Sequence, residues 1–236
     1  ELIPSDFIKE LIFILKENQS DRALKIFFEK IMRCEEKDKL NLLNSVCQVA
    51  KNNSDNVFEW VLRLSKQYPG DIGALCPLFL NVVTLHPGEA MFLEAGRLHS
   101  YLQGVGIELM ANSDNVLRGG LTPKFVDINE LLKILKFEVS ELKILKPKGF
   151  LPEKFFPDFV EEFSLSSIDA TGISDFEMEQ NKKPSILLCI EGSGKFLDGS
   201  EATNFEKGQS FFIPADQPTI KISGACRFYR ATVAGS

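Results

Sequence analysis

Histidine is scarce in this 236-residue chain, which holds only His86 and His99. His99 lies in "GEAMFLEAGRLHSYL" (residues 88–102), where the apolar runs around Gly96 predict a strand, a tight turn and a second strand. A histidine just past such a turn can present a ring nitrogen to a metal ion. His86 precedes Pro87 in another predicted turn, and we interpret it as a surface residue. A lone histidine after a turn is more often structural, so His99 is a candidate metal ligand only because of the motif that contains it.

Two cations follow in "LRGGLTPK". Arg118 offers a planar, permanently charged guanidinium, which suits a phosphate or a developing oxyanion. Lys124, six residues on, can add a point charge to the same phosphate. Gly119 and Gly120 let the backbone approach a ligand closely. Taken alone, Arg118 is better explained as a member of a surface ion pair, so the functional interpretation depends on the whole run.

Two carboxylates lie between the histidine and the arginine. Glu108 or Asp114 could act as a general base or proton shuttle, and the sequence does not decide between them. Asp114 in "NSDN" also fits a turn or a helix cap. Tyr101, two residues after His99, is expected on the same strand face and is a plausible wall of the pocket.

The elements that must position these residues fall into three segments. Residues 4–67 show four stretches of helical periodicity with caps at Ser5 or Asp6 and at Ser20 or Asp21, which predicts a small helical bundle. "YPGD" then breaks the pattern, and Val82, Val83, Phe92 and Tyr101 suit strands of an antiparallel barrel, followed by a helix that starts near Pro123 and Asp127. Residues 146–233 are rich in predicted strands and indicate a β-sandwich or barrel.

The composition excludes several classes of function. A net charge of −6 and a pI of about 5.2 argue against nucleic acid or an anionic membrane as the main partner, and no apolar run is long enough to span a membrane. The five cysteines are far apart and form no CxxC pair, which favours reduced thiols in a cytoplasmic protein. An anionic small substrate remains compatible with this balance, because a pocket can be locally basic.

An internal echo links the second and third segments. Gly88 to His99 can be laid over Gly208 to Thr219, with a glycine first, apolar residues in the same places and a turn after them. This phrase resembles the second cupin motif, which leads to a ligand histidine. The second copy ends in Thr219 and its segment has no histidine, so we expect one barrel built around a site and one without metal.

Residues 68–128 resemble type I mannose-6-phosphate isomerase (phosphomannose isomerase), above all in "ANSDNVLRGGLTPK" and "FLNVVTLHPGEAMFLEAGRLHSYLQG". The resemblance implies an α+β chain: a helical domain (1–67), the C-terminal part of a catalytic cupin or jelly-roll barrel (68–145) and a complete, metal-free C-terminal β-barrel (146–236). It also implies a zinc-dependent enzyme that interconverts mannose 6-phosphate and fructose 6-phosphate through an enediol.

The resemblance further implies roles for single residues. His99 corresponds to a zinc-binding histidine and Arg118 to the active-site arginine, while Glu108, Asp114 and Lys124 lie at positions that line the pocket. The family's other zinc ligands, a glutamine, a second histidine and a glutamate, precede its helical domain, and no Gln-x-His pair occurs in this chain. One histidine cannot complete a four-coordinate zinc site, so we expect this chain to be the C-terminal part of the enzyme and inactive alone.

Two other interpretations stay open. The chain could be a non-catalytic cupin module that binds a sugar phosphate or a partner protein. It could also be a purely structural helical and β scaffold, which predicts no phosphate binding.

Overall fold

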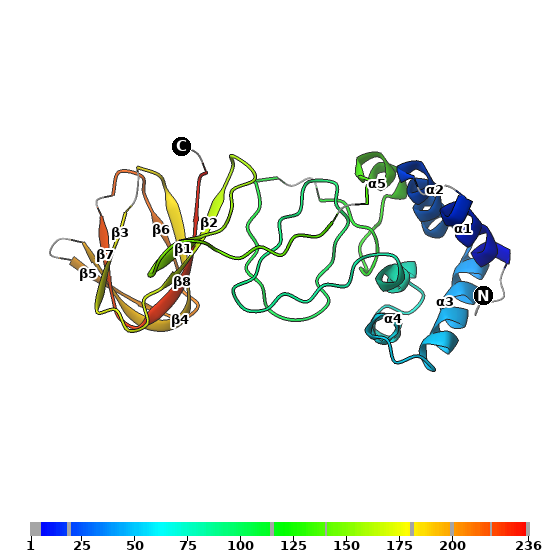
Figure 1. Cartoon of the computed structure of the whole chain (residues 1–236), viewed down its shortest axis with the longest axis horizontal. Coiled ribbons are helices and arrows are strands. Elements are labelled where there is room, and N and C mark those ends of the chain that lie inside the picture. The colour runs from blue at the N-terminus through cyan, green and yellow to red at the C-terminus, as the bar shows by residue number, and fades with distance from the viewer. Residues whose placement is uncertain are drawn as a thin grey trace. The chain divides into compact units, whose positions relative to one another are not determined.

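The structure is a computed structural model that describes residues 6–17, 20–113, 116–139, 141–179, 182–198, 201–217 and 219–234. The chain divides into two compact units (Figure 1). Unit 1 comprises Glu1–Thr84, Leu93–Ser100 and Asn115–Glu141. Unit 2 comprises Leu85–Phe92, Tyr101–Asp114 and Leu142–Ser236.

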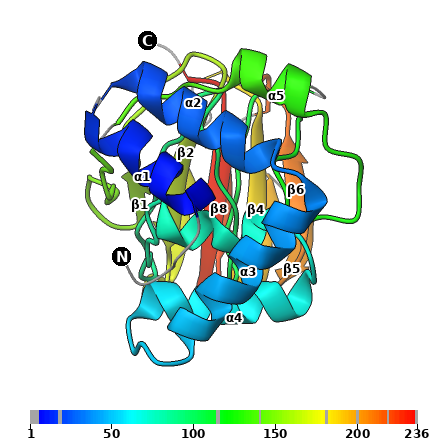
Figure 2. The ribbon, with the colours of Figure 1, turned by 90° about the vertical axis from the view of Figure 1, so that its right-hand side faces the viewer.

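Unit 1 is built from short helices. In the described part of the chain they are α1 (Asp6–Glu17), α2 (Asp21–Met32), α3 (Glu36–Ala50), α4 (Asn56–Gln67), the 3-10 helix η1 (Ile72–Leu78) and α5 (Ile128–Ile134). Helix α1 packs against α2, and α3 against α4 (Figures 1 and 2). No helix among the described residues is long and apolar enough to cross a membrane.

Side-chain caps fix where these helices begin. The Ser20 hydroxyl accepts a hydrogen bond from the Ala23 amide, and the Asp127 carboxylate accepts one from the Glu130 amide. Both caps agree with the sequence-based expectation, whereas Ser5 lies outside the described residues. The helices bury one face each, and Phe28 of α2 packs with Leu131 and Leu132 of α5.

Unit 2 contains an antiparallel sheet that curls on itself (Figure 1). Its described strands are β1 (Glu153–Phe155), β2 (Ser164–Asp169), β3 (Asp175–Met178), β4 (Ser185–Asp198), β5 (Glu201–Glu206), β6 (Ser210–Ile213), β7 (Ile220–Ser223) and β8 (Cys226–Thr232). The order is β1-β2-β8-β4-β7-β3, and β5 and β6 also pair with β4. Strand β4 is long and changes register at a bulge between Cys189 and Glu191, which lets one strand serve both ends of the curled sheet.

Alternate residues of these strands point inward and form the core of the sheet. Phe228 is 1% exposed, and its ring lies 4.9 Å from that of Phe205 and 5.8 Å from that of Phe196. Arg230, two residues on, is also buried, and its guanidinium donates to Glu153 and Ser185. The fold class is therefore the expected one: a helical region followed by a cupin-like β-domain.

The strands expected at Val82, Val83, Phe92 and Tyr101 are not formed. Among described residues 79–113, the only bridge joins Ala90 to Leu145. Strand propensity does not suffice here, because an extended segment becomes a strand only when a neighbour pairs with its backbone groups. Several apolar side chains of this segment are left exposed, among them Tyr101 and Val105.

Candidate functional site

The imidazole of His99 is oriented by its own backbone. Its Nδ1 lies 2.8 Å from the carbonyl oxygen of Arg97. A carbonyl can only accept, so Nδ1 carries the proton in this contact, and in the neutral form of the ring Nε2 is then the nitrogen with the lone pair. Metal-binding histidines are commonly fixed in this way by a second hydrogen bond. His99 is exposed in unit 1, so its ring does not face a sealed apolar interior.

The segment that carries His99 is anchored along one side. The Lys136 amide donates to the Gly96 carbonyl at 3.0 Å. Two ion pairs follow the same path, from Arg97 to Glu138 at 3.1 Å and from Lys136 to Glu94 at 2.9 Å. Because both pairs are partly exposed, they contribute more to alignment than to stability.

The loop that carries Arg118 lies against this segment. A Cβ atom added to Gly119 would come within 2.7 Å of Leu98 Cδ1, so only a glycine fits there without displacement of its neighbour. Leu98 precedes His99 and Gly119 follows Arg118. The structure thus brings the predicted histidine and arginine onto two touching stretches of unit 1.

Arg118 and Lys124 mark the two ends of residues 118–124, which we call the 118–124 loop. Both side chains are exposed, and the Lys124 amide donates to the Thr122 hydroxyl at 3.2 Å. Leu121, between them, has a φ of 54°, in the left-handed region that non-glycine residues rarely adopt. The loop therefore holds two cations on a tightly turned backbone.

Asp71 has a structural role that the sequence did not indicate beyond the break in the helical pattern at "YPGD". Its carboxylate Oδ1 accepts from the Gly73 amide at 2.7 Å and caps η1. Its Oδ2 accepts from the Leu121 amide, also at 2.7 Å. The local cap could be anticipated from an aspartate before a helix, but the bond to Leu121 spans 50 positions and left no local signal.

Tyr101 and Glu108 meet in unit 2. The Tyr101 hydroxyl donates to Glu108 Oε1 at 2.8 Å. Desolvation, together with the hydrogen bond to Glu108 and its negative charge, raises the pKa of Tyr101 to about 12. The phenol therefore stays protonated near neutral pH and can orient the carboxylate. Asp114, the other predicted carboxylate, lies outside the described residues.

The described residues do not build a metal site by themselves. No group of three or more His, Cys, Asp or Glu side chains lies together in the described part of the chain. Zinc needs about four ligands, and His99 offers one nitrogen. The five cysteines are free thiols, and burial, with the charge of Asp71 adding to it, raises the pKa of Cys76 to about 12.

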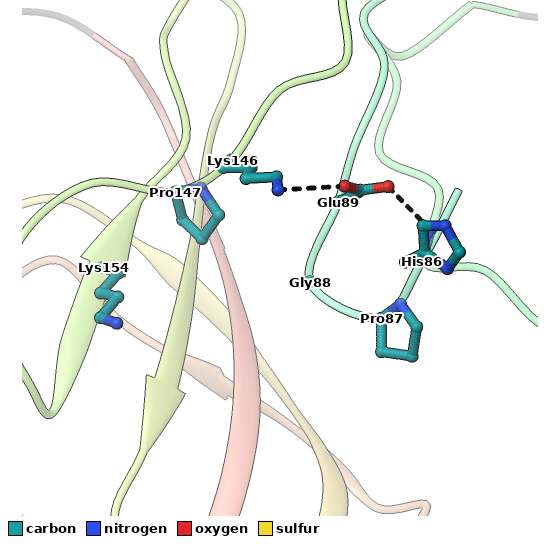
Figure 3. A pocket seen from close by; sticks show the side chains of 7 residues that line it. All are labelled: His86, Pro87, Gly88, Glu89, Lys146, Pro147 and Lys154. Carbon is teal, nitrogen blue, oxygen red and sulfur yellow. Dashed lines mark hydrogen bonds and ion pairs between the residues drawn. The ribbon is translucent and has the colours of Figure 1, made fainter. Parts of the chain in front are cut away.

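A shallow basic hollow of about 480 Å³ is present in unit 2 (Figure 3). Glu89 lies between Lys146 and His86, where one oxygen lies 3.3 Å from Lys146 Nζ and the other accepts from the His86 amide at 2.9 Å. His86 is exposed beside it, as expected for a surface residue. Because Glu89 already partners Lys146, the hollow lacks a built anion site.

Comparison with known proteins places these features in a family. Residues 4–80 match the model "Phosphomannose isomerase type I, helical insertion domain" and residues 152–233 match "Mannose-6-phosphate isomerase, cupin domain". Mannose-6-phosphate isomerase of Escherichia coli (strain K12) is 38% identical over 221 residues, which are 92% of this chain and 55% of that protein. The chain thus spans about half the length of the curated relatives it matches.

Solved structures agree. Mannose 6-phosphate isomerase from Salmonella typhimurium, bound to fructose 6-phosphate and zinc, superposes with a TM-score of 0.85 at 33% identity, covering 96% of this chain and 58% of that one. Alanine variants of the same enzyme were also solved, at a histidine, at a glutamate nine residues later and at an arginine nineteen residues after the histidine. His99, Glu108 and Arg118 have the same order and spacing. With helical and cupin-like parts both matched, this chain belongs to the type I phosphomannose isomerase family.

Proposed function

We propose that this chain is the C-terminal part of a zinc-dependent aldose–ketose isomerase that interconverts mannose 6-phosphate and fructose 6-phosphate through an enediol. We further propose that residues 1–67, 68–145 and 146–236 form its helical domain, the C-terminal part of its catalytic barrel and its metal-free β-domain. The relatives' names and the fructose 6-phosphate in the Salmonella typhimurium structure support this assignment. The free thiols support a cytoplasmic location.

The observation that carries the proposal is the shared spacing of histidine, glutamate and arginine, combined with the contact between Leu98 and Gly119. We assign to Arg118 and Lys124 the phosphate of the substrate or the oxyanion of the enediol. A guanidinium fork and an ammonium at two ends of one short loop fit a doubly charged phosphate.

Proton transfer between the first and second carbons of the sugar needs a general base whose side chain is held in a fixed orientation. Glu108 is our first candidate, because the Tyr101 hydroxyl holds one of its oxygens at 2.8 Å and leaves the other for the substrate. Tyr101 would then orient the base and line the pocket. Asp114 remains the alternative base.

We propose that His99 provides one zinc ligand and that the others come from the part of the relatives that this chain does not cover. Zinc, when bound, would polarise the sugar oxygens. The same part would pair with the extended backbone of residues 79–113. The isolated chain is then expected to bind no stoichiometric zinc and to lack turnover.

The test is coupled turnover of mannose 6-phosphate, with zinc, by the longest form of the protein that includes this chain. Replacing Arg118 by alanine removes a charged donor from the reacting substrate, so kcat/KM is expected to fall about 10²-fold or more. Arg22→Ala, an exposed arginine on α2, is the matched control and is expected to leave the rate unchanged. A loss of only a few-fold for Arg118→Ala would contradict its assignment.

The lack of a metal cluster in the described residues favours one alternative, a non-catalytic cupin module that binds a sugar phosphate or a protein partner. Calorimetry of the isolated chain with mannose 6-phosphate, beside metal analysis, separates the cases. Binding without zinc, combined with no turnover by the longer form, would support the module. Stoichiometric zinc on the isolated chain would contradict our incomplete site.

A further inference from the structure

We propose that Asp71 is a positioning residue for the substrate's phosphate, acting through the 118–124 loop. The inference rests on the proposed function, because that function assigns the phosphate to Arg118 and Lys124. Asp71 itself touches neither cation in the contacts described above. Its role is to hold the backbone on which both cations are mounted.

Both oxygens of the Asp71 carboxylate are engaged. Oδ1 accepts from the Gly73 amide within η1, and Oδ2 accepts from the Leu121 amide at the middle of the loop, each at 2.7 Å. Hydrogen bonds to a charged acceptor are shorter and stronger than neutral ones. One side chain therefore ties the start of a helix to a loop 50 positions away.

The backbone around this carboxylate is closely packed. A Cβ atom on Gly120 would lie 3.1 Å from Asp71 Oδ1 and 3.3 Å from the Cα of Gly73, and Gly120 has a φ of 128°. A Cβ atom on Gly73 would lie 3.0 Å from the same Oδ1. Two glycines thus leave room for the carboxylate between η1 and the loop, where the Leu121 amide donates to it.

The anchor is rigid at its other end. Ile72, Ala74 and Leu75 of η1 are buried, so the helix that Asp71 caps is part of the core of unit 1. On the loop side, Gly119 rests on Leu98, next to His99. A fixed path therefore runs from the core through Asp71 to the residue that follows Arg118.

An aspartate is required by this geometry, not merely tolerated. Asparagine has the same shape but only one acceptor oxygen, and its amide group would point donor hydrogens at one of the two backbone amides. Asp71→Asn should therefore keep the fold. We expect its single acceptor oxygen to stay with the Gly73 amide, two residues away, so that the Leu121 amide of the loop loses its acceptor. The free Leu121 amide and the loosened Arg118 are the two measurable consequences.

The experiment compares Asp71→Asn with wild type in the zinc-loaded, longest form of the protein that includes this chain. Amide exchange at Leu121 is expected to accelerate by about tenfold or more, since a hydrogen bond to a charged acceptor is lost. KM for mannose 6-phosphate, and the dissociation constant of inorganic phosphate, are expected to rise about tenfold, with kcat changing less. A purely structural role would lower the melting temperature without this selective rise in KM.

The matched control is Asp55→Asn. Asp55 also caps a helix, accepting from the Val57 amide at 3.0 Å, but it lies at the start of α4 and not at the loop. It should change neither Leu121 exchange nor KM. If Asp71→Asn does not fold, Gly120→Ala probes the same contact from the loop side and should raise KM in the same way.

Unchanged exchange at Leu121, or faster exchange with unchanged KM and phosphate affinity, would overturn the inference. Failure of the proposed function looks different. Wild type would then not turn over mannose 6-phosphate, while Asp71→Asn would still weaken the binding of inorganic phosphate. Wild type that neither turns over the sugar nor binds phosphate would overturn both.

Discussion

Residues 88–92 and 208–212 start from a glycine in the same left-handed conformation, with φ of 84° at Gly88 and 91° at Gly208. After Gly208 the chain enters β6, which pairs with β4 from Ser210 to Ile213. After Gly88 the same number of residues makes a single bridge, from Ala90 to Leu145. The two copies of the repeated phrase thus share the conformation of their opening glycine. They differ in the residues that follow, which form a paired strand only in the second copy.

The difference lies in what surrounds each copy. Ile213 is 6% exposed because β4, β8 and the phenylalanine core enclose it. In the first copy Leu93 is only half-buried, and the following stretch from Tyr101 to Met110 leaves large apolar side chains in solvent. A strand-like residue pattern therefore shows only that a segment can form a β-strand. The segment forms one when a neighbouring strand pairs with its backbone.

We expect the largest change in stability from a substitution in the phenylalanine core of the β-domain. Phe228→Ala removes a ring that is 1% exposed and packed on two others, so the free energy of unfolding of the β-domain is expected to fall by about 3–5 kcal/mol. Denaturant unfolding followed by circular dichroism measures it. Phe212→Ala, in the same domain but 66% exposed, should change the value by less than about 0.5 kcal/mol. Equal losses would show that the sheet has no distinct inner face.

A smaller effect is expected from the polar end of the same interior. Arg230 is 4% exposed, lies 3.3 Å from Glu153 and donates to Ser185 at 3.1 Å. Arg230→Met leaves the largely buried Glu153 carboxylate without its ion-pair partner and should cost about 3 kcal/mol in the same unfolding assay. Arg227→Met on the opposite face of β8 is the control, since its exposed pairs with Asp169 and Glu191 should matter little. An Arg230 variant as stable as the Arg227 variant would contradict the buried network.

Much of the fold could be predicted because its rules are local. The caps at Ser20 and Asp127 and the alternating strands after residue 160 depend on residues within one or two turns of each other. The order of the strands in the sheet could not be predicted in this way. Nor could the ion pair between Arg230 and Glu153, because these two residues are 77 positions apart. Contacts of that range depend on how the whole sheet closes.

The proposed site shows the same division between local and long-range signals. His99, Glu108 and Arg118 were proposed through resemblance to a family, and the hydrogen bond between Tyr101 and Glu108 joins residues only seven apart. The sequence did not point to Asp71, because its hydrogen bond to Leu121 joins residues 50 positions apart and nothing in "YPGDIG" indicates which residue it contacts. A supporting residue becomes visible only when the fold brings its partner to it.

The smallest change in stability is expected from substitutions at the glycines that open the two similar phrases. Gly208→Ala and Gly88→Ala put a side chain on the same left-handed backbone, and neither new Cβ would meet another atom within 4 Å. At Gly208 the turn is fixed by β6, so the strain cannot relax and should cost about 1 kcal/mol. At Gly88 the turn rests on the bond from the Glu89 amide to the His86 carbonyl and can shift, so the cost should be under about 0.5 kcal/mol. Equal costs would mean that residues 88–92 are held as firmly as β6; a larger cost at Gly88 in the longest form of the protein would instead indicate that a partner strand has joined them.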